Sequence, residues 1–164
     1  MTSAENRAAN VRLLALDVDG VMTDGRIYYT SAGEEIKAFN IKDGLGIKLL
    51  QTAGVKVAII TGRQSEIVAR RAQELGIDYV IQGREDKREA LMELCQSNHI
   101  ELVECAYMGD DLPDLGAIRA AGLGMTVADG SSAVREAADW LVLIVTLTVW
   151  QLLHWRRRRS SRSL

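Results

Sequence analysis

The stretch LLALDVDGVMTD, residues 13–24, constrains the fold more than any other part of the chain. It opens with an apolar run bounded by acidic residues and Gly20, which is typical of a strand buried on both faces of a parallel sheet. Asp17 and Asp19 follow where this strand ends. Open α/β sheets bind their ligands at the carboxyl ends of their strands. The stretch therefore predicts a central strand that brings two carboxylates to a functional edge.

Strand and helix patterns alternate along the rest of the chain. Further strands are expected at residues 55–60, 78–81, 105–108, 122–127 and from about 140, and helices at 43–53, 66–75, 87–98 and from about 132. This alternation predicts an α/β fold with a Rossmann-like, doubly wound parallel sheet. We expect Asp43 and Ser65 to cap their helices, and Leu45, Leu49 and Leu50 to form the apolar face of the first.

Three segments are expected from the changes in composition. Residues 1–10 form a polar arm, residues 11–145 the folded domain, and residues 146–164 a tail that is apolar and then rich in arginine. Within the domain, residues 26–30 and 35–39 flank a turn that contains glycine. This pattern predicts a small β-hairpin at about 26–39, placed to lie over the acidic loop.

Charge and residue usage exclude several classes of function. The formal charge is −2, but five arginines lie in the last nine residues, which leaves −7 for residues 1–155. So acidic a body argues against nucleic acid as a partner. The two cysteines suit reduced, buried thiols of a cytoplasmic protein. The two histidines are far apart in sequence, which disfavours a zinc site, and the polar N-terminus lacks the pattern of a signal peptide.

Polar groups gather at the ends of the predicted strands. Beside Asp17 and Asp19, these are the group Thr61, Gly62 and Arg63, the group Asp110, Asp111 and Asp114, and Lys87 at the start of a helix. Each has an ordinary explanation as an acidic turn, a helix cap or a solvated charge. Because like charges so closely spaced repel one another, a divalent cation explains the acidic groups better. A calcium loop of EF-hand type fails, since Val21 and Met22 stand where an oxygen ligand and glycine are needed.

Together these groups fit a site for phosphoryl transfer. Asp17 can attack phosphorus while Asp19 protonates the leaving oxygen and later activates water. Mg²⁺ between Asp17 and Asp110 would relieve the charge repulsion that opposes attack. Thr61 and Lys87 can hold phosphate oxygens.

The segments DVDGVMTD, TGR, QGREDK and GDDLPD resemble the four motifs of haloacid dehalogenase-type phosphatases. Over residues 11–140 the chain is similar to the family that hydrolyses 3-deoxy-D-manno-octulosonate 8-phosphate for lipopolysaccharide synthesis. The resemblance implies a fold without a large cap domain and an aspartyl-phosphate formed on Asp17. It implies Mg²⁺ held by Asp17, the backbone carbonyl of Asp19 and Asp110, with Asp111 and Asp114 in support. It also implies a homotetramer whose subunits complete one another's sites.

The choice of substrate rests on fewer residues. A sugar-acid phosphate carries a carboxylate as well as a phosphate, and Gly62, Arg63, Arg71 and Arg84 are the candidate groups to bind it. In similar phosphatases that act on a nononate 9-phosphate, the position that resembles Arg63 holds a glutamate. The arginine in this chain therefore favours the octulosonate as substrate. The nononate, another sugar phosphate, and a non-catalytic assembly subunit remain alternatives.

The tail departs from the family pattern. Residues 140–155 carry no formal charge and RRRRSSRSL follows them. The apolar run fits a last strand with a buried or interface helix, and it is short for a membrane span. A membrane tail and a segment produced by an altered reading frame stay open as interpretations.

Overall fold

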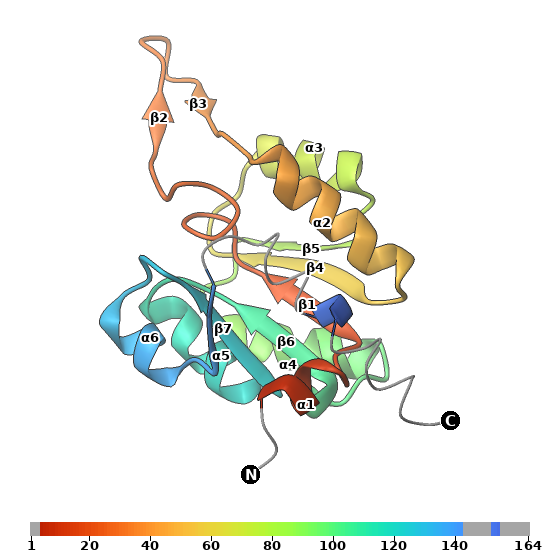
Figure 1. Cartoon of the computed structure of the whole chain (residues 1–164). Helices are drawn as coiled ribbons and strands as arrows, with labels where there is room; N and C mark the ends of the chain where they lie inside the picture. Colours follow the sequence, from red (N-terminus) through yellow and green to blue (C-terminus); the bar gives the residue numbers. More distant parts are fainter. Residues whose placement is uncertain (1–3, 143–151, 155–164) are drawn as a thin grey trace.

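Six parallel strands form the central sheet, in the order β5-β4-β1-β6-β7-β8. The computed structural model describes residues 4–142 and 152–154, and helices cover both faces of the sheet (Figure 1). The strands are β1 (Leu13–Leu16), β4 (Lys56–Thr61), β5 (Tyr79–Gln82), β6 (Cys105–Met108), β7 (Leu123–Val127) and β8 (Trp140–Val142). The predicted α/β fold with a doubly wound parallel sheet is confirmed.

β1 lies inside the sheet because its side chains are apolar on both faces. Leu13 and Ala15 are fully buried in the core on one side, and Leu14 and Leu16 in the core on the other. β1 pairs with β4 along one edge and with β6 along the other. Asp17, the next residue, is thereby placed between the ends of two neighbouring strands.

The helices divide between the two faces. The core cluster with Leu14 and Leu16 includes residues of α1 (Ala4–Ala8), α2 (Ile41–Thr52) and α3 (Glu66–Leu75). The cluster with Leu13 and Ala15 includes residues of α4 (Lys87–Ser97), α5 (Leu115–Ala120) and α6 (Ser132–Ala137). Two 3₁₀ turns, η1 (Leu102–Glu104) and η2 (Leu112–Asp114), precede β6 and α5.

The predicted hairpin is present. β2 (Tyr28–Tyr29) pairs antiparallel with β3 (Glu35–Ile36), and the hairpin projects beyond the sheet (Figure 1). Its apolar side chains are largely exposed, including Tyr29 and Ile36. The paired segments are short because this ribbon has little of the chain to pack against.

The expected start of α2 is wrong, and its expected apolar face is right only for Leu50, which is fully buried. Asn40, not Asp43, caps the helix, and its side chain accepts a hydrogen bond from the Lys42 N–H at 2.9 Å. Leu45 and Leu49 are 62% and 47% exposed. The buried face of α2 combines Ile47 and Leu50 with two glycines, and α3 packs closely against one of these, Gly44. A Cβ on Gly44 would lie 2.6 Å from Nη2 of Arg71.

The expected capping role of Ser65 is also wrong. Ser65 stands at the N-cap position of α3, but its side chain makes no capping hydrogen bond. Its hydroxyl instead donates to Glu35 Oε2 at 2.9 Å. The hydroxyl therefore ties the start of α3 to the hairpin.

Both ends of the described chain contact the domain. In the N-terminal arm, Arg7 of α1 pairs with Asp139 at 2.6 Å and donates to the Gly122 carbonyl at 3.0 Å. Leu152 is fully buried in the core cluster that includes α1 and α2. Most of the apolar and arginine-rich tail lies outside the described residues. Within 4–142 and 152–154, no helix combines the length and apolar character needed to cross a membrane.

Candidate active site

Asp17, Lys87 and Asp114 form a buried charged cluster at the end of β1. Lys87 Nζ lies 2.9 Å from Asp17 Oδ2 and 2.7 Å from Asp114 Oδ1. All three residues are at most 6% exposed. Burial lowers the pKa of Lys87, but the two carboxylates outweigh this effect, so the net direction is upward. Lys87 is therefore a fixed positive charge beside Asp17.

Asp114 organises the loop that follows β6. Its Oδ1 accepts from the Tyr107 hydroxyl at 2.7 Å as well as from Lys87. Its Oδ2 accepts from the backbone N–H groups of Asp110 and Asp111, at 3.1 and 3.2 Å. The Asp114 carboxylate has donors on both oxygens, so it shapes the loop and has little capacity left for a metal ion.

Asp111 has a local role in the same loop. It is exposed, and its side chain accepts from the Leu112 N–H at 2.8 Å as the cap of η2. Pro113 lies in the first turn of η2, where its fixed φ and missing N–H are tolerated. The cap aligns the turn that returns Asp114 beneath the loop.

Asp17 and Asp110 are suited to hold a divalent cation. Carboxylate oxygens of Asp17, Asp110 and Asp114 lie within 4.8 Å of one another. Burial, with repulsion from Asp114, raises the pKa of Asp17 to about 7. Burial and the neighbouring Asp114 and Asp111 raise the pKa of Asp110 to about 6. A bound cation would offset this repulsion, and oxygen donors are the ligands that Mg²⁺ prefers.

Gly20 makes room for Asp110 against the β1 loop. Its φ is +95°, and a Cβ at this position would collide with the Asp110 carboxylate. Glycine adopts a positive φ without steric cost. The residue thus permits the approach of two loops that are distant in sequence.

Asp19 lies at the other side of the loop, between two cations. Lys37 Nζ contacts Asp19 Oδ1, and Arg63 Nε lies 3.9 Å from Asp19 Oδ2. Glu35 links these cations, since its Oε1 lies 3.7 Å from Lys37 Nζ and 2.8 Å from Arg63 Nη2. Burial raises the pKa of Glu35, but the Ser65 hydrogen bond and the two cations lower it further, so the net direction is downward.

The remaining predicted residues occupy two kinds of position. Thr61 is buried at the end of β4, beside the end of β1. Gly62 follows it and lies against Glu85, because a Cβ on Gly62 would be 3.0 Å from Glu85 Oε1.

The arginines differ in their partners. Arg71 lies over the Phe39 ring, 5.7 Å from its centroid, and pairs with Glu74 at 3.3 Å. Arg84 pairs with Asp86 at 2.6 Å and Glu93 at 3.0 Å. All three arginines have carboxylate partners, but only Arg63, which pairs with Glu35, also faces Asp19.

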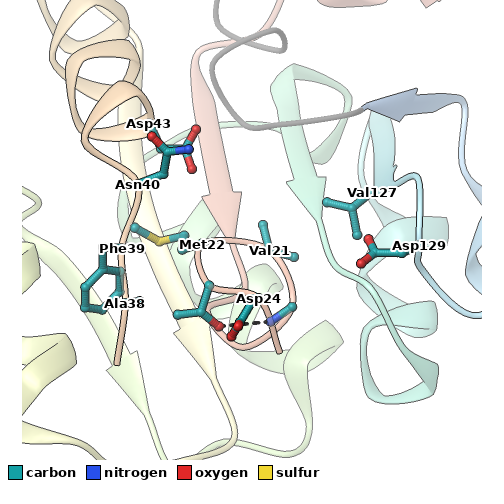
Figure 2. Close-up of a pocket in the computed structure, with 11 residues that line it drawn as sticks. Val21, Met22, Asp24, Ala38, Phe39, Asn40, Asp43, Val127 and Asp129 are labelled. Atoms are coloured by element: carbon teal, nitrogen blue, oxygen red, sulfur yellow. Dashed lines mark hydrogen bonds between the residues drawn. The ribbon is translucent and has the colours of Figure 1, made fainter. Parts of the chain in front are cut away.

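A pocket of about 400 Å³ opens beside the β1 loop (Figure 2). It is lined by that loop, by the segment leading into α2 and by the end of β7, and Asp24, Asp43 and Asp129 are among its residues. Three carboxylates make a poor surface for a phosphate group. Lys87, the buried cation that suits phosphate, lies outside this lining.

Known proteins share both this sequence and this fold. A family model described as haloacid dehalogenase-like hydrolase matches residues 41–122. The 3-deoxy-D-manno-octulosonate 8-phosphate phosphatase KdsC of Yersinia pestis is 44% identical, over 84% of this chain and 82% of the relative. The chain belongs to this phosphatase family. The KdsC of Escherichia coli K12 is likewise 44% identical, over 84% of this chain and 73% of that protein.

Solved structures of the phosphatase family match the whole fold. The structure of the Moraxella catarrhalis phosphatase, in complex with magnesium, phosphate and KDO, has a TM-score of 0.93 and 43% identity. The match covers 96% of this chain and 94% of the Moraxella catarrhalis chain. The cobalt-bound Haemophilus influenzae phosphatase has a TM-score of 0.89 and 35% identity, covering 94% of each chain. The resemblance inferred from the four motifs is confirmed, and the chain is a phosphatase.

Sequence reasoning did not find three residues that contact the candidate site residues. Tyr107 is fully buried in β6 and resembles any core aromatic until its hydroxyl is seen to meet Asp114. Glu35 and Lys37 alternate with apolar residues in the hairpin, which is the pattern of a solvated strand face. The signal that was available for them is the hairpin itself, which was predicted to lie over the acidic loop.

Proposed function

We propose that the protein hydrolyses 3-deoxy-D-manno-octulosonate 8-phosphate to the free sugar acid and phosphate, with Mg²⁺, in the synthesis of lipopolysaccharide precursors. The observation that carries the proposal is that Asp17 lies close to both Lys87 and Asp110, with Asp19 in the same loop. Relatives that bear this activity in their names, and a related structure that contains Mg²⁺, phosphate and KDO, support it.

The first step transfers the phosphoryl group to Asp17. A carboxylate oxygen of Asp17 forms a bond to phosphorus while the bond from phosphorus to the sugar oxygen breaks. Asp19 gives its proton to that sugar oxygen, so the sugar leaves as an alcohol. Lys87, 2.9 Å from Asp17, and the hydroxyl of Thr61, buried at the end of the neighbouring strand β4, can donate hydrogen bonds to the phosphate oxygens and stabilise their charge.

The second step returns the enzyme to its starting state. Asp19, now a carboxylate, takes a proton from water as the water oxygen bonds to phosphorus. The bond from phosphorus to the Asp17 oxygen breaks, and inorganic phosphate is released. Asp17, the Asp19 backbone carbonyl and Asp110 would hold Mg²⁺, which neutralises the negative charges that face each other during attack.

Arg63 is the residue that we assign to the carboxylate of the sugar acid. Its side chain is 42% exposed and lies beside Asp19, so it faces both the acid and the solvent. An arginine pairs with a carboxylate through two parallel hydrogen bonds. Gly62, Arg71 and Arg84 are proposed as further substrate contacts at the outer part of the site.

We also propose that subunits assemble into a homotetramer. Ile41, Leu45 and Leu49 are exposed on α2, and Ile27, Tyr29 and Ile36 are exposed on the hairpin. Contiguous apolar side chains on a surface mark a protein interface.

We propose that residues 11–145 form the catalytic domain. We also propose that the protein acts in the cytoplasm, where its two buried, unpaired cysteines stay reduced.

The decisive experiment compares three substrates with and without Mg²⁺. Phosphate release from the octulosonate 8-phosphate should exceed release from a nononate 9-phosphate and from 4-nitrophenyl phosphate. Arg63→Ala should raise KM for the octulosonate about tenfold or more while leaving the aryl phosphate little changed. Equal, slow turnover of all three would overturn the substrate assignment, and no turnover of any would favour a non-catalytic assembly subunit.

A further inference from the structure

Lys37 is an unusual residue for its place in the fold. It follows β3 at the exit of the exposed hairpin (Figure 1), yet its side chain is only 2% exposed. A lysine is rarely buried unless its charge is paired, because the ammonium group loses its hydration. Two carboxylates provide that pairing, Asp19 in direct contact and Glu35 with its Oε1 at 3.7 Å.

These groups close a ring of four alternating charges. Asp19 contacts Lys37, Lys37 faces Glu35, Glu35 binds Arg63 at 2.8 Å, and Arg63 Nε returns to Asp19 Oδ2 at 3.9 Å. The ring joins the β1 loop, the hairpin and the loop after β4. Each oxygen of Asp19 therefore faces a cation from a different segment of the chain.

The two cations differ in what else they can do. Arg63 is 42% exposed, whereas Lys37 is enclosed by its partners. An exposed arginine can turn toward an anionic substrate, but Lys37 has no comparable access to solvent. When Arg63 binds substrate, Lys37 is the cation that still holds Asp19.

We propose that Lys37 is a positioning residue, through which the hairpin holds the Asp19 carboxyl in line with the leaving oxygen. The proposal rests on the proposed function of Asp19 as the proton donor. Glu35 holds Lys37 in place in turn. Its carboxylate pairs with Lys37 and Arg63, and it accepts a hydrogen bond from Ser65.

A comparison of leaving groups separates this role from general support of the fold. An alkyl phosphate needs a proton on its leaving oxygen, whereas 4-nitrophenolate leaves without one. Loss of acid positioning should therefore lower kcat/KM for the sugar phosphate far more than for 4-nitrophenyl phosphate. Damage to the fold would lower both values together.

The variants are Lys37→Met, Lys37→Arg and, as a matched control, Lys56→Met, an exposed lysine at the start of β4, the end of the strand away from Thr61. Lys37→Met should lower kcat/KM for the sugar phosphate about 10²-fold, with a loss at least about tenfold smaller for the aryl phosphate. Asp19→Asn should show the same dependence on the leaving group. Lys37→Arg should restore part of the loss, and Lys56→Met should match the unaltered protein.

Each outcome decides the proposal. Equal losses for both substrates in a folded Lys37→Met protein, or no loss, would overturn it. If Lys37→Met does not fold, Lys37→Arg and Glu35→Gln carry the same comparison. If the unaltered protein cleaves glycerol phosphate but not the octulosonate phosphate, the substrate assignment fails while glycerol phosphate still tests Lys37. If it cleaves no phosphate monoester, both proposals fail.

Discussion

Lys87 Nζ lies between two carboxylates, 2.9 Å from Asp17 Oδ2 and 2.7 Å from Asp114 Oδ1. One cation thus links the proposed nucleophile after β1 to the residue that organises the loop after β6. Lys87 thus has a proposed catalytic role beside Asp17 and a structural role in its pair with Asp114, and each role can be measured separately.

Replacement of Lys87 by Met should destabilise the protein by about 3–5 kcal/mol in the absence of Mg²⁺, because two buried carboxylates then face each other with no positive charge between them. Urea unfolding near pH 8 measures this loss. Arg88→Met is the matched control, since Arg88 is exposed and its pair with Glu89 spans 3.8 Å. The control should change stability by less than about 1 kcal/mol. A loss no larger than that of the control would contradict the structural role of Lys87.

Asp17→Asn should lower turnover at least about 10³-fold, because the amide cannot attack phosphorus. The substitution also removes a charge that faces Asp114, so the metal-free variant should melt no lower than the unaltered protein. Phosphate release and a thermal melt test the two statements. Unchanged turnover would remove Asp17 from the mechanism.

Mg²⁺ should stabilise the protein more at about pH 7.5 than at about pH 5. The pKa values of Asp17 and Asp110 are raised from 3.8 to about 7 and about 6 in the folded state. Between about pH 4 and 7 the metal-free folded protein therefore binds more protons than the unfolded chain. The contribution of these groups to its stability falls as the pH rises through that window. Since Mg²⁺ competes with the protons, its shift of the melting temperature should grow with pH, and an equal shift at both pH values would contradict this linkage.

Gly20→Ala should weaken Mg²⁺ binding about tenfold or more, because the added methyl group displaces the Asp110 carboxylate and strains a positive φ. Calorimetric titration with Mg²⁺ measures the effect. Gly33→Ala is a control for backbone strain, because Gly33 also has a positive φ and a Cβ there meets no atom within 4 Å. Equal affinities in the two variants would show that the contact with Asp110 is unimportant.

Removal of residues 146–164 should leave Mg²⁺ affinity unchanged while lowering stability. The proposed ligands come from the loops after β1 and β6, whereas the removed segment includes Leu152, which is fully buried in the core. Loss of such a side chain costs about 2–5 kcal/mol. Denaturant unfolding and Mg²⁺ titration of the shortened protein check both parts, and a fall in affinity would tie the tail to the metal site.

Sequence reasoning located the parallel strands well because each is a continuous apolar run, as in Leu13–Leu16 and Cys105–Met108, where every residue is buried. It located the polar groups at the strand ends for the same reason, since parallel strands share one carboxyl edge. The structure brings Asp17, Lys87 and Asp110 together there, and their catalytic roles stay predictions.

The failures arose where burial depends on a neighbour that the local pattern does not contain. Leu45 is apolar yet exposed, because α3 packs against the glycine face of α2 instead. Lys37 is charged yet buried, because Asp19 and Glu35 surround its ammonium group. In both cases the partner is set by tertiary packing, and hydrophobicity along the chain carries no information about it.

The interior place of β1 has a consequence for synthesis on the ribosome. On one side β1 pairs with β4, which is synthesised as residues 56–61. On the other side it pairs with β6, which is synthesised only as residues 105–108. A growing chain that has not yet reached β6 carries a fully apolar strand with one open edge, and such edges promote aggregation. The same strand therefore protects that edge and leads directly into the loop that bears Asp110, a proposed ligand of Mg²⁺.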